Sequence, residues 1–156
     1  MPAPERDWDK VLAFWFEETL PAQRFKKDPE FDQKIRAGFE ALHQLARSGG
    51  LAAWEESPDG VLALVIILDQ FSRNMFRGQA QAFACDAQAL GLARRALERG
   101  FDRFVALDRR MFLYLPFMHS ENLADQERSV ALFDALARAQ GQPIDPNSYA
   151  RRHQII

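Results

Sequence analysis

The sequence contains 156 residues, of which 47% are hydrophobic and 27% charged, and its formal net charge at pH 7 is −2. This length predicts a single domain over residues 1–156, and the composition is ordinary for a globular protein. A nucleic-acid-binding domain usually carries a basic face or a high pI. The slightly acidic balance therefore argues against a nucleic-acid partner.

Features that indicate a compartment are few. Cys85 is the single cysteine, which excludes an intramolecular disulfide and a multi-cysteine zinc site. The first residues, MPAPERDWDK, lack the basic and apolar regions of a signal peptide. No apolar run reaches the length of about 18 residues that suggests a transmembrane helix. We therefore expect a soluble, cytoplasmic protein that does not enter a membrane.

The first half of the chain predicts three helices. Apolar residues at three- and four-residue spacing indicate a helix over Asp7–Thr19. The pair Asp28-Pro29 is typical of a helix start, and the glycines at 49–50 are typical of a helix end. The pair Ser57-Pro58 predicts an N-cap and a first helical residue. We therefore assign the apolar run Val61–Leu68 to a helix rather than to a strand.

The next predicted helix spans Ala82–Arg99. Its apolar spacing places Phe83 and Ala87 on the inward face. A glycine inside a helix often allows a close approach of another helix, so Gly91 is expected to mark such a contact.

Three further helices are expected after residue 100. One covers Leu107–Leu115 and is broken at Pro116, because proline lacks the backbone donor that a helix interior needs. A second covers Leu123–Ala139, and a last one opens at Asp145-Pro146.

The overall pattern is helical throughout. Strand-like alternation is absent from the sequence, and short links marked by Gly or Pro are typical of antiparallel helical neighbours. The segment DAQALGLARRALERG weakly echoes SVALFDALARAQG further along the chain. We predict an all-α fold, a tetratricopeptide-like stack of antiparallel helical hairpins that forms an α-α superhelix, although no clean tetratricopeptide consensus is present.

A polar cluster follows the apolar run at its C-terminal end. Asp69 and Arg73 are spaced to share a helix face, as are Arg73 and Arg77, and Asn74 lies beside them. A guanidinium group binds carboxylates and phosphates in bidentate fashion, so the cluster favours an anion-binding face. The structural alternative is that Asp69 pairs with Arg73 while the other side chains cap neighbouring backbone groups.

A second cluster follows the predicted break at Pro116. His119 is a candidate general base, with Glu121 or Asp125 as its partner. The alternative is that the neighbouring polar residues cap a helix and that His119 lies at the core edge. The cluster lacks the cysteine pair of a zinc deaminase and the His-Glu-x-x-His motif, so neither a metal ion nor a cofactor is predicted.

Three longer motifs suggest a family. The segments LDQFSRNMFRG, MFLYLPFMHSENLADQERSVALF and YARRHQII resemble the bacterial domain-of-unknown-function 924 family, and the resemblance extends from Ala13 onward. It implies an all-α, tetratricopeptide-like fold and no established activity. Family members continue into a basic, aromatic segment, and the chain stops at Ile156 before it. We therefore expect the C-terminal family segment to be missing.

Three functions follow from these features. The first is a binding module that recognises an anionic peptide or a small metabolite in a concave polar site. The alternative is a hydrolase-like enzyme for small molecules that uses His119 with Glu121 or Asp125. A structural role, with a protein partner or as a homo-oligomer, would show as an exposed apolar patch. The residues predicted to bind the ligand are Asp69, Arg73, Asn74, Arg77, His119 and Glu121.

Overall fold

The computed structural model describes residues 7–142, and within that range every regular element is helical. The all-α prediction is therefore confirmed for the described residues. In chain order the elements are α1 (Asp7–Ala13), η1 (Phe14–Glu18), α2 (Pro21–Arg24), α3 (Pro29–Arg47), η2 (Ala52–Glu56), α4 (Pro58–Val65), η3 (Ile66–Phe71), α5 (Ser72–Met75), η4 (Ala80–Phe83), α6 (Asp86–Glu98), η5 (Phe101–Phe104), α7 (Met111–His119) and α8 (Leu123–Ala139).

The central helix is formed by α4, η3 and α5, which follow one another without a break. Ser57 caps its start by accepting a hydrogen bond from the backbone N–H of Gly60, and Pro58 is its first residue. Every residue from Gly60 to Phe71 is buried. A helix that is apolar on all sides must be covered on all sides, which is why the rest of the chain packs around this one.

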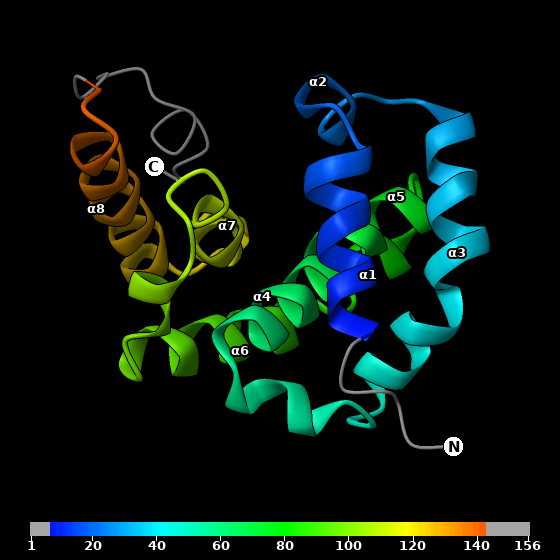
Figure 1. Ribbon diagram of the computed structural model, residues 1–156, viewed down its shortest axis with the longest axis horizontal. Helices are drawn as coiled ribbons and strands as arrows, with labels where there is room; N and C mark the ends of the chain where they lie inside the picture. Colours follow the sequence, from blue (N-terminus) through cyan, green and yellow to red (C-terminus); the bar gives the residue numbers. More distant parts are fainter. Residues whose placement is uncertain (1–6, 143–156) are drawn as a thin grey trace.

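The other helices cover the central helix from two directions (Figure 1). On one side α1 packs on α4, and α3 packs on η3 and α5. On the other side α6 packs on α4, α7 packs on α6, and α8 packs on α7. The buried apolar side chains form one cluster, which includes Trp15, Trp54, Phe71 and Phe112.

The structure corrects the prediction for the helix before residue 100. The helix α6 begins at Asp86, and the preceding turn η4 has 3-10 geometry. Because that turn rotates the chain differently from an α-helix, Phe83 is 60% exposed rather than buried. Ala87 is also exposed. A side chain at Gly91 would meet nothing closer than the Arg95 guanidinium at 3.5 Å, so no other helix approaches there.

A second correction concerns Pro116. The helix α7 continues through this proline to His119, and every residue from Phe112 to Met118 is buried. A proline inside a helix costs roughly 3 kcal/mol, and the burial of this apolar segment between α6 and α8 offsets that cost. His119 is therefore the last residue of α7, and it lies shortly before Asn122, the residue that caps the start of α8.

The helix predicted over Leu123–Ala139 is confirmed as α8. The helix predicted from Asp145-Pro146 lies outside the described residues. None of the helices between residues 7 and 142 is both long enough and apolar enough to cross a membrane. A tetratricopeptide-like superhelix stays a prediction.

Candidate functional site

The buried carboxylate of Asp69 lies at the centre of the candidate site. Asp69 belongs to η3, the π-helical part of the central helix, and is 1% exposed. Its Oδ1 is 3.0 Å from Nη1 of Arg73 and 2.8 Å from Nδ1 of His119. Its Oδ2 accepts a hydrogen bond of 2.8 Å from Nε2 of Gln70. A buried charge of this kind is tolerated only when it is paired and hydrogen-bonded, and both conditions are met.

These contacts determine the ionisation of Asp69. Burial by itself raises the pKa of the carboxyl. The opposing effects of His119, Arg73 and Gln70 outweigh it, so the pKa of Asp69 lies below its ordinary value. Asp69 is therefore a carboxylate at neutral pH.

Arg73 connects this carboxylate to α6. Its Nη1 and Nη2 donate to the two carboxylate oxygens of Asp86 at 2.9 and 3.0 Å, a bidentate pair. Its Nη1 also donates to the backbone oxygen of Asp69 at 2.9 Å. The guanidinium carbon lies 5.3 Å from the centre of the exposed Phe83 ring. The arginine is thus held in one position by groups from three sides.

A cavity of about 420 Å³ opens beside this network. Such a volume lies within the range of small-molecule sites. The residues that line it come from α5, η4, α6, α7, the following loop and α8, and they are Arg73, Phe83, Asp86, Met118, His119, Ser120, Glu121 and Gln126.

His119 contributes a ring nitrogen to this cavity. Its side chain is 17% exposed, and Nδ1 makes the hydrogen bond to Asp69. No residue between 7 and 142 is hydrogen-bonded to the other ring nitrogen, Nε2. A histidine that lines a cavity, with one ring nitrogen held by a carboxylate and the other without a described partner, is arranged for proton transfer.

Two predicted binding residues lie elsewhere. Arg77 is paired with Asp32 of α3 through an Nε–Oδ2 contact of 2.8 Å, and Asn74 donates to Oδ1 of the same carboxylate at 2.9 Å. The hydrogen bond that Arg77 donates to Asp32 raises the pKa of Arg77. Neither Asn74 nor Arg77 lines the cavity. The two arginines therefore do not share an anion, because each has its own carboxylate partners.

The predicted partners of His119 are placed differently from one another. Glu121 lines the cavity and is exposed. Asp125 is 7% exposed and accepts a hydrogen bond from the Ser120 hydroxyl at 2.7 Å. Asp125 is also ion-paired with Arg94 of α6, and these contacts leave its pKa lowered despite the burial that opposes ionisation. In the structure the carboxylate that bonds His119 is that of Asp69, while Asp125 joins α8 to α6.

Five residues that line the cavity are not among those predicted to bind a ligand, and they are Phe83, Asp86, Met118, Ser120 and Gln126. Asp86 pairs with Arg73 across 13 positions, a spacing that indicates no particular contact. Phe83 was assigned to the core, although its exposure makes it a cavity wall. Gln126 is 1% exposed and lies on α8. A buried amide on an otherwise amphipathic helix is an unusual position, and this is the one signal that could have identified it.

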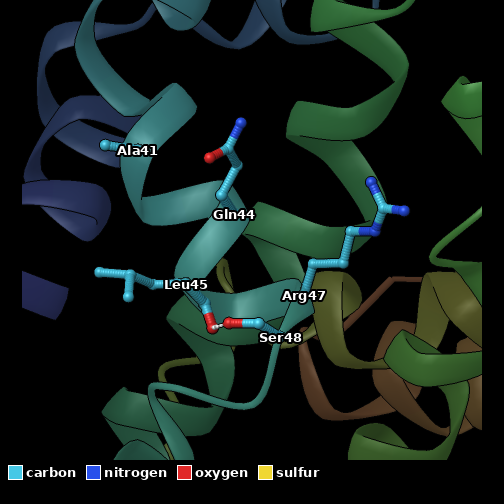
Figure 2. Close-up of a pocket in the computed structure, with 5 residues that line it drawn as sticks. All are labelled: Ala41, Gln44, Leu45, Arg47 and Ser48. Atoms are coloured by element: carbon cyan, nitrogen blue, oxygen red, sulfur yellow. Dashed lines mark hydrogen bonds between the residues drawn. The ribbon is translucent and has the colours of Figure 1, made fainter.

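A second hollow lies on the outer side of α3, away from this network (Figure 2). Its volume is about 600 Å³, and it is lined by Ala41, Gln44, Leu45, Arg47 and Ser48. The hydroxyl of Ser48 donates to the backbone oxygen of Leu45 at 3.1 Å. Arg47 is the single ionisable group among these residues, so the hollow offers no acid–base pair.

Between residues 7 and 142, no three His, Cys, Asp or Glu side chains gather where they could hold a metal ion. In the candidate site Arg73 lies between the carboxylates of Asp69 and Asp86. Its guanidinium group occupies the place that a cation would take.

Comparison with known proteins identifies the family. The family profile of bacterial proteins of unknown function designated DUF924 matches residues 11–156. The chain belongs to this family. The resemblance noted in the sequence is therefore confirmed.

A solved structure of another protein of unknown function, from Agrobacterium tumefaciens, is similar to this DUF924 protein. The two share 34% sequence identity with a TM-score of 0.84, over 97% of this chain and 80% of that chain. No curated protein matches the chain. These comparisons support a common fold and carry no activity over to the site.

Proposed function

We propose that the cavity binds a small molecule and that His119 transfers a proton to or from it, as in a hydrolase-like enzyme. The observation that supports this proposal is the 2.8 Å contact between His119 Nδ1 and the buried carboxylate of Asp69, in a ring that lines an open cavity. His119 is the acid–base group in this proposal, and Asp69 is the positioning residue.

The chemistry follows from the geometry of the pair. An ionised Asp69 accepts the Nδ1–H of His119, which leaves the lone pair of Nε2 available to take a proton from a substrate or from water. The carboxylate also stabilises the imidazolium that forms, because it lies within hydrogen-bond distance in a buried site. A positioned general base of this kind accelerates proton transfer by about 10²–10⁴-fold.

A binding module for an anionic peptide or metabolite is the second candidate. This function is the one expected first from the sequence, for a cytoplasmic protein with a single tetratricopeptide-like domain. Its support is Arg73, which lines the cavity beside His119 and Glu121. The described hydrogen bonds of that guanidinium group already go to Asp69 and Asp86, so we rank this candidate below acid–base chemistry.

The first prediction concerns catalysis by His119. The protein is incubated with a bacterial metabolite extract, and mass spectrometry identifies the compounds that are consumed relative to a protein-free sample. Consumption should fall about 100-fold or more in His119→Ala, because the general base is lost. Added imidazole should restore part of the activity.

The matched control is Arg77→Gln, which changes an arginine outside the cavity. This variant should consume the same compounds at the same rate as the unchanged protein. Equal consumption by His119→Ala and the unchanged protein would contradict the acid–base proposal, as would the absence of any consumed compound. Retention of an anionic metabolite without its conversion would favour the binding-module candidate.

A further inference from the structure

Two donor side chains on the cavity wall, those of Arg73 and Ser120, already bind carboxylates. The described bonds of Arg73 go to the carboxylates of Asp69 and Asp86 and to a backbone oxygen. The hydroxyl of Ser120 donates to Asp125. The positive charge of Arg73 is therefore already compensated by two carboxylates, and the Ser120 hydroxyl hydrogen is used, which makes the wall less suited to an anionic ligand.

The side chain of Gln126, in the buried part of the wall, also has its donor hydrogens in use. It lines the cavity and is 1% exposed. Its Nε2 donates to the backbone oxygens of Met118 and Ser120, so both amide hydrogens are used and the orientation of the amide is determined. Its Oε1 is buried without a hydrogen-bond partner. A buried acceptor without a partner is unfavourable, and the group that completes it must be a donor.

The charges on the cavity wall also favour a ligand that carries a positive charge. Among the described residues, the wall and its support contain the carboxylates of Asp69, Asp86 and Glu121 against the single guanidinium of Arg73. Glu121 is exposed and has no ion-pair partner between residues 7 and 142. Arg94 is engaged with Asp125 and does not line the cavity. The described wall therefore carries an excess of negative charge.

The wall also has an apolar part, which can pack against the carbon skeleton of a ligand. Phe83 of η4 is 60% exposed, and Met118 of α7 also lines the cavity. The ring of Phe83 already has the Arg73 guanidinium carbon 5.3 Å from its centre, which shows that a cation is accommodated at this ring.

We infer that the ligand of this cavity is a small organic cation, a molecule with a protonated amine on an apolar stem. The protonated amine is attracted by the excess carboxylate charge of the wall, while the stem packs on Phe83 and Met118. This specificity rests on the proposal that the cavity binds a small molecule, and it replaces the anionic ligand expected from the sequence.

The test is a titration of the full chain with three probes of one shape: benzylamine, benzyl alcohol and benzoate, at neutral pH. Nuclear magnetic resonance follows the backbone amide signals of Phe83, Met118 and Glu121. Benzylamine should bind about fivefold or more tightly than benzoate, because the ammonium group interacts favourably with nearby carboxylates. This preference should weaken as salt is added.

Glu121→Gln should weaken benzylamine binding about two- to fivefold, since the change removes one exposed carboxylate at the rim. Glu127→Gln is the matched control, because Glu127 is also exposed but does not line the cavity. Its benzylamine affinity should be unchanged.

Two results would overturn the cation specificity. One is benzoate binding as tightly as benzylamine or more tightly. The other is the absence of benzylamine binding at the cavity up to millimolar concentrations. Neither depends on His119, so the acid–base proposal is judged separately by whether His119→Ala still consumes metabolites.

Discussion

At the scale of single residues, Asp69 shows how a charge can be kept inside an apolar helix. Removing water from a carboxylate is unfavourable by several kcal/mol unless donors replace it. Three side chains do so here, two from the same helix and one, His119, from 50 positions further along the chain. The arrangement leaves the carboxylate ionised and holds the histidine ring, so stability and the proposed acid–base chemistry depend on one group.

We predict that Asp69→Asn lowers the free energy of unfolding by about 2–4 kcal/mol. The amide cannot replace the charge that Arg73 and His119 face, and breaking one side of a buried ion pair is strongly destabilising. Urea denaturation at neutral pH measures this loss. The variant should also lose most of the metabolite consumption, because the ring of His119 is no longer held by a carboxylate.

Asp32→Asn is the matched control for that measurement. Asp32 also pairs with an arginine, Arg77, and accepts a hydrogen bond from Asn74. The pair is more exposed, with side-chain exposures of 36% for Arg77 and 14% for Asp32, so the loss should stay near about 1 kcal/mol. A larger loss in Asp32→Asn than in Asp69→Asn would contradict the central place of Asp69.

The residue contacts explain what the sequence could predict about the site. The pairing of Asp69 with Arg73 follows from helical spacing and is observed at 3.0 Å. The partner of His119 was sought among nearby acids, Glu121 and Asp125, because sequence spacing carries no information about contacts across the fold. The bond to Asp69 requires the end of α7 to lie against η3, which is a property of packing.

At the scale of elements, the close backbone contact between two elements occurs at a different glycine from the one predicted. Gly91 was expected to mark a close approach, but the close approach is at Gly60. A side-chain carbon added there would lie 2.2 Å from the backbone oxygen of Trp54 in η2. Gly60 stands among turn residues in the sequence, so its pattern indicates a turn and does not reveal the neighbouring carbonyl.

We predict that Gly60→Ala lowers the free energy of unfolding by about 3 kcal/mol or more, because α4 and η2 would have to separate. Gly38→Ala is the control inside α3, where a side-chain carbon meets nothing within 4 Å. That change should raise the free energy of unfolding by about 0.5–1 kcal/mol through helix propensity. Thermal unfolding of both variants measures the difference, and equal effects would rule out the contact with Trp54.

At the scale of the whole molecule, capping residues and apolar runs predicted the helices more reliably than did the residues expected to break them. The pairs Asp28-Pro29 and Ser57-Pro58 predicted the starts of α3 and α4 correctly, because capping is a local interaction. Pro116 did not end α7, because burial on both sides offsets its local effect. The site is assembled from η3, α5, η4, α6, α7 and α8, so only part of it was accessible to local patterns.

Protonation of buried groups should link the stability of the whole molecule to pH in two separate ranges. His43 is 3% exposed, and burial together with Arg47 lowers its pKa below the ordinary 6.5. The pKa values of Asp69 and Asp125 are also lowered, from an ordinary 3.8. In each case the unfolded chain binds the proton more readily than the folded chain, so stability falls as pH falls from the ordinary value toward the lowered one.

We predict that the free energy of unfolding falls first as pH drops below 6.5, through His43, and again below 3.8, through Asp69 and Asp125. Each group contributes at most about 1.4 kcal/mol per pH unit. Urea denaturation from pH 8 to about pH 3, repeated with His43→Gln, separates the ranges, because the variant lacks the imidazole and keeps both carboxylates. The first decline should become shallower and the second should persist. Identical curves for both proteins would exclude His43 as the source of the first decline.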